Sequence, residues 1–311
     1  MPFDNLKPKR LAKKNVVLFG EVLADVFPDE SVLGGAPFNV ARHLQAFDFH
    51  PVMISRTGND LLRDELLREM DRLGMDTIGI QCDQNYPTGQ VKVNLENGNH
   101  KFTILPDQAY DHIHAGIARM ITMSIKPELV YFGTLAQRSM PSRLALDKFL
   151  SDSKCPHFFD INLRHPWYNK HTVRRSLMCS DIVKMNEDEL EIVASYFKIN
   201  ASTPPLKAKA LLDQFELQYL LVTCGEHGAW LINKQHEIYN AEPVALTQAT
   251  VDTVGAGDAF SAVIITGLLN GWAMPVALQR ANQFAAAICG IRGGAPQQHD
   301  FYIPFKQAWN L

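Results

Sequence analysis

The sequence predicts an α/β fold in which a mostly parallel central sheet carries a small additional β-sheet. Apolar segments of strand length alternate with amphipathic segments of helix length, which is typical of a sheet covered by helices on both faces. Residues 88–104 break this rhythm, because they alternate apolar and polar side chains around an Asn97-Gly98 turn. We interpret this stretch as a β-hairpin inserted into the α/β unit, where it would form a lid.

Length, charge and composition argue against several classes of protein. The chain has 311 residues and a net charge of −3 with acidic and basic residues interspersed, which argues against a nucleic-acid or membrane partner. No apolar run is long enough to span a bilayer and no signal-peptide pattern is present, so we expect a cytoplasmic protein. The five scattered cysteines indicate neither a disulfide framework nor a zinc site, and we expect reduced, mostly buried thiols.

The first predicted strand is the continuous apolar run 16–23, which is followed by Asp25. An acidic residue after a central strand lies where open α/β sheets bind ligands, although it also suits a turn; we favour the ligand role. Gly34 and Gly35 then predict a turn, and Pro37 suits the first turn of a helix that contains Asn39. Asn39 either reaches a ligand near Asp25 or, as is commoner for a lone asparagine, bonds to local backbone.

Further strands are predicted near residues 129–133, 155–161, 181–185 and 218–223, and polar residues follow three of them. Asp160, Asn162 and Arg164 occupy alternate positions and share one side if the chain is extended there. Asn186 and Glu189 have the spacing of a helix capping box, which needs no ligand. The segment 223–228 is a glycine-bearing turn. Because the carboxyl ends of parallel strands form one rim, we expect these clusters to lie together.

The segment DTVGAGDAF at residues 252–260 is the most informative in the chain. Its glycines permit a tight turn before an apolar helix, so that backbone N–H groups and the positive end of the helix dipole create a phosphate site. Asp258 lies inside that site. The nonapeptide alone leaves open whether this carboxylate caps the helix or acts as a catalytic base.

Taken in order from about residue 16 to 296, these motifs resemble the ribokinase/PfkB carbohydrate kinases. The resemblance rests on Gly34-Gly35 with Asn39, on Asn186 with Glu189, on residues 223–228 and above all on residues 252–260. Within the family, the GExLxD motif at 20–25 and the DxNxR motif at 160–164 are similar to those of fructokinases. The resemblance implies a ribokinase-like three-layer α/β/α domain over residues 15–311, with lid segments near 31–36 and 86–105.

The resemblance also implies roles at the reacting centre. Asp258 would remove the proton from a sugar hydroxyl, and the N–H groups of Gly255, Ala256 and Gly257 would form an anion hole for the transferred phosphoryl group. The sugar would be bound by Asp25, Gly35, Asn39 and Arg164, with Gln90 and Phe102 supplied by the lid. The chain lacks the GxxxxGK[ST] sequence, so it is not a P-loop enzyme.

Nucleotide and ion sites follow from the same resemblance. Asn186 and Glu189 would organise Mg²⁺ and the phosphates through water, which suits the reluctance of magnesium to lose its waters. ATP would be bordered by Asn186, Thr223, Gly225, Gly228 and Asn282. Asp252, with carbonyl groups near residues 288–294, matches the position of a monovalent cation, and Arg292 in that loop leaves K⁺ dependence open.

The activity implied is ATP-dependent phosphorylation of fructose to fructose 6-phosphate. A 2-keto-3-deoxygluconate kinase is the alternative, because Arg164 suits a substrate carboxylate as well as hydroxyls. A nucleoside kinase would need an aromatic acceptor pocket, for which Phe27 and Phe38 are the nearby residues. A sensor that binds sugar or nucleotide without catalysis is disfavoured by the presence of Asp258. We also expect a homodimer that forms through the lid, with Val91, Val93 and Leu95 at the interface.

Overall fold

The computed structural model describes residues 13–27, 30–96, 99–244 and 251–311. Its main element is a 9-stranded sheet in the order β13-β12-β11-β10-β9-β8-β1-β4-β5. Neighbouring strands run parallel from β5 to β11, whereas β12 and β13 extend the sheet antiparallel. The strands are β1 (Asn15–Phe19), β4 (His50–Thr57), β5 (Ile80–Cys82), β8 (Leu129–Phe132), β9 (His157–Asp160), β10 (Ile182–Asn186), β11 (Tyr219–Thr223), β12 (Ala229–Asn233) and β13 (Ile238–Ala241).

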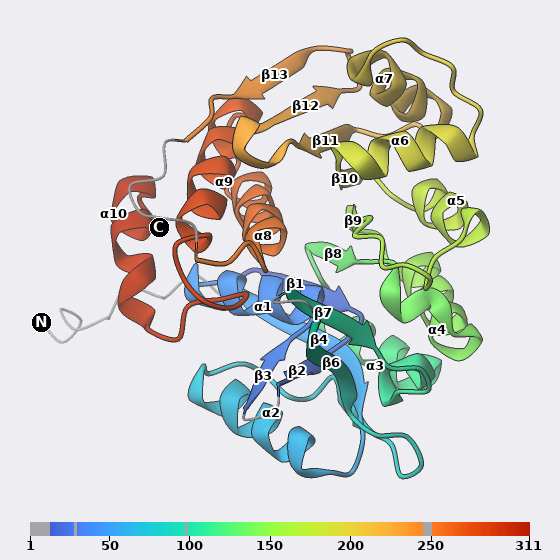
Figure 1. The fold of residues 1–311 in the computed structure, drawn as a ribbon, viewed down its shortest axis with the longest axis vertical. Coiled ribbons are helices and arrows are strands. Elements are labelled where there is room, and N and C mark those ends of the chain that lie inside the picture. Colours follow the sequence, from blue (N-terminus) through green and yellow to red (C-terminus); the bar gives the residue numbers. More distant parts are fainter. Residues whose placement is uncertain (1–12, 28–29, 97–98, 245–250) are drawn as a thin grey trace, which may run out of the picture.

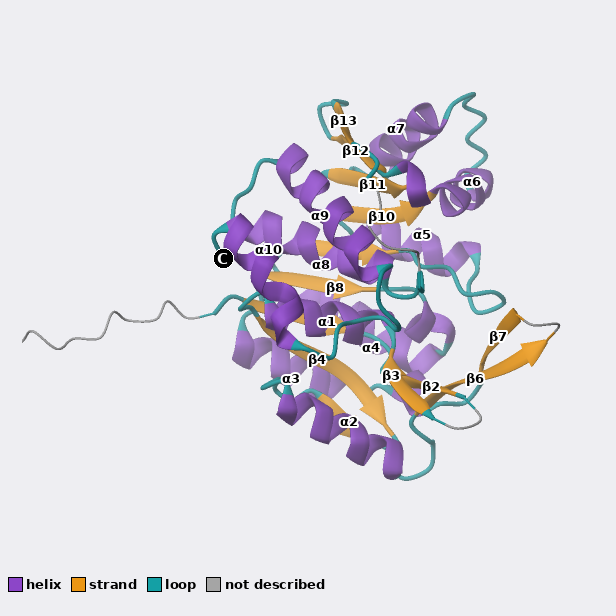
Figure 2. Cartoon of the chain, turned by 60° about the vertical axis from the view of Figure 1, so that its left-hand side comes forward, coloured by secondary structure: helices purple, strands orange, loops and turns teal. Residues whose placement is uncertain are grey.

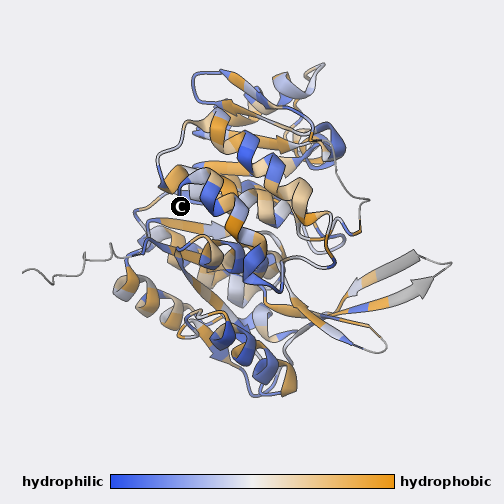
Figure 3. Cartoon of the chain, turned by 90° about the vertical axis from the view of Figure 1, so that its left-hand side faces the viewer, coloured by the Kyte–Doolittle hydropathy of each residue, from blue (hydrophilic) through white to orange (hydrophobic). Residues whose placement is uncertain are grey.

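Helices cover both faces of this sheet (Figure 1). The side chains of β1 alternate between these two faces. Val16 and Leu18 belong to one core cluster, and Val17 and Phe19 belong to the other. The first face is covered by α1 (Ala36–Ala46), α2 (Leu61–Arg72), α8 (Ala256–Leu269), α9 (Met274–Ile288) and α10 (Ile303–Trp309). The second is covered by α3 (Ala115–Ile125), α4 (Met140–Asp152), α5 (Lys170–Met178), α6 (Glu187–Tyr196) and α7 (Pro204–Gln214). Figure 3 shows hydrophobic residues concentrated along the strands between these layers.

The predicted strand 16–23 is two strands. β1 ends at Phe19, and β2 (Leu23–Val26) belongs to the second sheet. The chain turns at Gly20, whose φ of 155° favours glycine and where a Cβ atom would lie 2.7 Å from Cγ of Pro37. Asp25 therefore lies within a strand of the small sheet and not beyond a central strand. The apolar pattern hid the break because Val22, Leu23 and Ala24 continue it.

The small sheet has the order β3-β2-β6-β7 and projects from the large domain (Figure 2). Its other strands are β3 (Ser31–Gly34), β6 (Gly89–Glu96) and β7 (Asn99–Ile104). Val91 and Val93 are only 5% and 3% exposed within the single chain, and Val91 packs with Leu23 and Tyr110. These two valines are therefore not free to form the expected dimer interface. The side chain of Leu95 lies outside the described residues.

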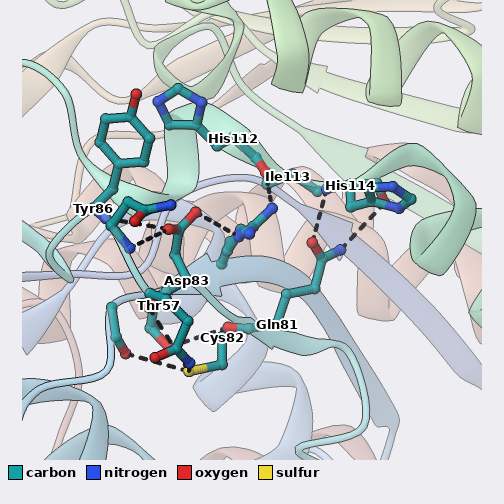
Figure 4. A network of polar contacts seen from close by, with 12 residues as sticks. Thr57, Gln81, Cys82, Asp83, Tyr86, His112, Ile113 and His114 are labelled. Atoms are coloured by element: carbon teal, nitrogen blue, oxygen red, sulfur yellow. Dashed lines mark hydrogen bonds and ion pairs between the residues drawn. The ribbon is translucent and has the colours of Figure 1, made fainter.

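The start of β6 is fastened to the large domain by polar contacts. Thr88 donates its backbone N–H and its hydroxyl to the two carboxylate oxygens of Asp60, at 2.7 and 2.6 Å. On the same side, Asp83 accepts from the backbone N–H groups of Asn85 and Tyr86 and pairs with Arg56 at 2.8 Å (Figure 4). Asp60 also caps α2, so one carboxylate holds both a helix end and the base of the lid.

No helix in the described part of the chain is long and apolar enough to cross a membrane. All five cysteines are free thiols in the structure. The expectation that most are buried is wrong, because Cys82 and Cys179 are exposed and the other three are partly exposed.

Candidate active site

A cavity of about 1580 Å³ lies where the carboxyl ends of the central strands meet the small sheet. The connections that leave β1 and β8 lead to helices on opposite faces of the sheet, which makes this the place where open α/β sheets bind ligands. All the predicted site residues except Gln90 line this cavity. Segments separated by more than 200 residues are thus brought to one site.

Asp258 lies in the first turn of α8 and is 9% exposed. Its carboxylate makes no capping bond; instead Oδ2 accepts a hydrogen bond of 2.8 Å from Nδ2 of Asn39 at the start of α1. Asn39 therefore reaches across the site and does not bond to local backbone. Burial raises the pKa of Asp258 from 3.8 to about 6, and the bond from Asn39 partly opposes this rise. At neutral pH the carboxylate is largely ionised and can accept a proton.

Gly255 precedes α8 and shapes the turn that was predicted to bind phosphate. Its φ is 78°, and a Cβ atom there would lie 2.3 Å from Cα of Gly294, so only glycine fits. The amide groups of Gly255 and Gly257 have no acceptor within the described part of the chain, whereas that of Ala256 donates to the carbonyl of Thr253 at 3.3 Å. Two amides at the positive end of the helix are thus available to an anion.

Lys184 is a site residue that the sequence analysis missed. Its ammonium group lies 2.9 Å from the position that a Cβ atom on Gly257 would take, and it contacts both carboxylate oxygens of Asp160 at 3.1 Å. Burial alone would lower the pKa of Lys184, but the Asp160 carboxylate outweighs it, so the net pKa is raised and the side chain stays charged. A charged residue inside the apolar strand 182–186 was the signal that could have identified it.

Asp160, Asn162 and Arg164 do not share one extended face. Asp160 ends β9 and is buried against Lys184, Tyr131 and Ser261. Asn162 has φ of 40°, so the chain turns there and only Asn162 and Arg164 reach the cavity. Arg164 is exposed at the rim.

The acceptor end of the cavity contains Asp25, Gly35, Asn39 and Phe102, together with Arg164. Burial raises the pKa of Asp25 to about 6, and Arg164 partly offsets this rise. Gln90 was expected at the sugar site, but it does not line the cavity. Its neighbour Val91 does, and because side chains alternate along β6, Gln90 lies on the other face of the small sheet. Phe38 is fully buried in the core and is not available to stack on a base.

Asn186 and Glu189 form the capping box that their spacing allowed. Oδ1 of Asn186 accepts from the backbone N–H of Glu189, and Oε2 of Glu189 accepts from that of Asn186, at 2.8 and 2.9 Å. Oε1 of Glu189 accepts from the N–H of Leu163, so the carboxylate also fixes the loop after β9. Both residues line the cavity, so the cap and a ligand role are compatible.

The far end of the cavity is lined by Thr223, Gly225, Gly228 and Asn282. A Cβ atom on Gly228 would lie 2.7 Å from the carbonyl oxygen of Ala241, and the amide of Asn282 donates to Glu242 at 2.8 Å. Asp252 connects two loops beside the glycine turn, because its oxygens accept from the N–H groups of Val254 and Gly293 at 3.0 and 3.1 Å.

Comparison with known proteins decides the family. A model described as "pfkB family carbohydrate kinase" matches residues 9–299. The chain belongs to this family. It is a carbohydrate kinase of the pfkB type, and the alternative of a binding protein from another class is no longer needed to explain its motifs.

Relatives of this pfkB kinase cover nearly its whole length at low identity. An uncharacterized sugar kinase of Pyrococcus horikoshii is 29% identical over 301 residues, covering 92% of this chain and 90% of that protein. Its crystal structure superposes with a TM-score of 0.76, covering 95% and 99% of the two chains at 25% identity, and it has also been solved in complex with ATP. A fructokinase of Escherichia coli is 25% identical over 274 residues, covering 81% of this chain and 84% of that protein.

The structural neighbours include more than one type of pfkB enzyme. The structure of 2-dehydro-3-deoxygluconokinase from Thermotoga maritima has a TM-score of 0.79 at 16% identity, covering 94% of this chain and 99% of that one. At such identity the similarity supports the fold alone. The fold is therefore ribokinase-like, as predicted, and the sugar that this kinase phosphorylates is a separate question.

Proposed function

We propose that this kinase transfers the γ-phosphoryl group of ATP to a hydroxyl of a sugar, and that the sugar is fructose, phosphorylated at O6. The observation that carries the proposal is the position of Asp258, a buried carboxylate held by Asn39 in the same helix turn as the free amides of Gly255 and Gly257. A general base and an anion site within one helix turn suit an alcohol as the nucleophile and a phosphoryl group as the electrophile. The reaction consumes ATP, which agrees with the expected cytoplasmic location.

Each residue then has a physical task. Asp258 accepts the hydroxyl proton, and the bond from Asn39 holds the carboxylate in one orientation. The amides of Gly255 and Gly257 donate to oxygens of the transferred phosphoryl group, and the ammonium of Lys184 adds positive charge beneath them. Thr223, Gly225, Gly228 and Asn282 accommodate the nucleotide, and the lid, which carries Asp25 and Phe102, keeps water from the acceptor hydroxyl.

The oxygen donors of Asn186 and Glu189 suit a hydrated Mg²⁺ ion that is held through its water molecules. No cluster of three or more His, Cys, Asp or Glu side chains that could hold a metal occurs among the described residues. Glu189 already accepts two backbone N–H groups, so it would hold water molecules of the ion and not the ion itself, and Asn186 would lie beside the phosphates. When bound, Mg²⁺ neutralises charge on the phosphate oxygens.

For a monovalent cation, the fitting residue is Asp252. Its carboxylate lies beside the glycine turn and joins the loops 252–254 and 289–294, whose carbonyl groups are the oxygen donors that K⁺ requires. Occupancy there would stiffen the turn that carries Gly255. We therefore propose activation by K⁺.

The second candidate function is phosphorylation of a sugar acid such as 2-keto-3-deoxygluconate. The observation that favours it is Arg164, a guanidinium group at the acceptor end of the cavity. For a nucleoside acceptor, Phe38 is in the core and not available to stack on the base, which leaves Phe27 at the cavity wall.

The test is ADP release with MgATP against fructose, ribose, 2-keto-3-deoxygluconate and adenosine, for the wild type and Asp258→Asn. We expect turnover on fructose that falls by several orders of magnitude in the variant. Turnover on another sugar would retain the kinase function and reject fructose. Turnover by Asp258→Asn equal to that of the wild type would reject Asp258 as the base.

A further inference from the structure

Glu21 lies in the short segment of chain between β1 and β2, and it lines the cavity. We propose that Glu21 binds a hydroxyl group of the acceptor and makes the site select neutral sugars over sugar acids. This inference rests on the proposed function and narrows the class of its substrate.

The first observation is an unsatisfied oxygen. Glu21 is 4% exposed, and its Oε2 atom has no hydrogen-bond partner within the described part of the chain. A buried carboxyl oxygen without a partner costs free energy, so its retention at the wall of a ligand cavity points to a partner that arrives with the ligand. A sugar hydroxyl is a donor of the right size.

The second observation is that Gly35 packs closely on the backbone and the base of the side chain of Glu21. Glu21 directly follows the turn at Gly20 and lies beneath Gly35. A Cβ atom on Gly35 would be 2.8 Å from the carbonyl oxygen of Glu21 and 3.4 Å from its Cγ. Close packing on the glycine turn therefore restricts the base of this side chain, from which the carboxyl group reaches the cavity wall.

The third observation concerns the charges that face Glu21. Burial, with a smaller contribution from Asp258 on α8, raises the pKa of Glu21 to about 7, against opposing effects of its own backbone N–H and of Arg164. Arg138 opposes this rise but is engaged by Asp111, with Nε and Nη2 at 2.8 and 2.7 Å from its two oxygens. The groups that interact electrostatically with Glu21 are Asp258, Arg164, Arg138, Tyr110 and Tyr131.

The resulting balance of charge at the acceptor end is acidic. Glu21, Asp25 and Asp258 line it, whereas the basic residues there, Arg164 and Arg292, are exposed, and Arg292 is paired with Glu30. Lys184 is paired with Asp160 beneath the anion site. A sugar carboxylate would add negative charge among three partly desolvated acidic groups, where repulsion is poorly screened. A neutral sugar meets no such repulsion, and its hydroxyl can donate to Oε2 of Glu21.

The test compares the wild type with Glu21→Gln, which keeps the shape and removes the charge. Glu128→Gln is the matched control, because Glu128 is exposed and precedes β8 at the opposite end of the sheet. Dissociation constants for fructose and for 2-keto-3-deoxygluconate are measured by calorimetry, and kcat/KM is measured for both. We expect fructose binding to weaken about tenfold in Glu21→Gln, as for loss of a hydrogen bond to a charged group, and the preference for fructose over the acid to fall further.

A pH series separates a role in selectivity from a role in folding. In the wild type, preference for the neutral sugar should increase as pH rises through about 7, because Glu21 then becomes ionised. Glu21→Gln should lose that part of the increase, and Glu128→Gln should keep it. If Glu21→Gln does not fold, Glu21→Asp takes its place, because aspartate keeps the carboxylate but is one methylene shorter. This variant should bind fructose more weakly than the wild type and keep the pH dependence of the preference.

An unchanged preference in Glu21→Gln overturns the inference, and so does a wild type that prefers the sugar acid. Either result leaves the kinase function intact if Asp258→Asn abolishes turnover. If the wild type turns over neither sugar, the proposed function fails, and the ratio of the two dissociation constants still tests Glu21.

Discussion

The burial of the Asp258 carboxyl group makes the free energy of unfolding depend on pH. Burial raises its pKa to about 6, so the folded protein holds the proton more tightly than the unfolded chain. Its stabilising contribution is complete below pH 4 and is lost as pH rises through about 6. We expect Asp258→Asn to be more stable than the wild type by about 1–3 kcal/mol at pH 8 and equally stable at pH 4.

Urea denaturation at the two pH values measures this difference, with Asp71→Asn as the control because Asp71 is exposed. A variant that is less stable at pH 8 would show that the carboxylate is better compensated than its burial indicates.

Asn39 provides the second prediction at this scale. Its amide donates to the ionised form of Asp258 and so lowers that pKa. In Asn39→Ala we expect the acid limb of kcat/KM to move to higher pH, because the base then loses its proton less readily. The pH profile of kcat/KM on the preferred sugar is the measurement. An unmoved limb with reduced kcat/KM would mean that Asn39 binds the sugar without tuning the base.

The sequence predicted the local backbone where a motif determines it, as in DTVGAGDAF at 252–260, whose turn and helix appear as expected and line the cavity. It failed where the role depends on a distant partner. Nothing near Lys184 in the sequence indicates that Gly257 lies against its ammonium group, and nothing near Glu21 indicates that Gly35 covers it. Gln90 was misplaced because the face of a lid strand depends on its register with β2.

Among the elements, the base of the lid makes a testable contact. Thr88 is fully buried; its hydroxyl donates to Asp60 and accepts from the N–H of Gly58 at 2.9 Å. We expect Thr88→Val to lower the free energy of unfolding by about 2 kcal/mol, because a buried amide and a carboxylate lose a partner. The KM for the sugar should rise more than that for ATP, since β6 borders only the acceptor.

Equilibrium denaturation and steady-state kinetics check this, beside the exposed control Thr77→Val. Equal rises in both KM values would argue that the lid base acts on the whole site.

The elements themselves were largely predictable, because apolar runs and caps are local properties. The strands near 129, 181 and 218 and the capping box at 186–189 appear where expected. The division of 16–23 into β1 and β2 was not predictable from hydropathy, since both strands are apolar. Only the contact of Gly20 with Pro37, which requires the tertiary structure, shows why the chain turns there.

For the whole molecule, the dimer remains a prediction. Val91 and Val93 are covered within the chain, so a second copy would have to pair with the outer strands of the small sheet, where Phe102 is 50% exposed. Light scattering at micromolar concentration should give twice the 34.9 kDa of the chain. A mass of one chain would reject the dimer.

The packing of α8 against α1, and of α9 against α8, β12 and β13, also bears on how the protein is synthesised (Figure 1). These helices come from the end of the chain, whereas Val16 and Leu18, which they help to cover, leave the ribosome early. Until residue 288 has emerged, α1 and α2 are in place on this face of the central sheet, but the part that α8 and α9 cover is open. A nascent chain of this kinase therefore exposes a hydrophobic surface through most of translation, and we expect it to bind chaperones until its last helices are released.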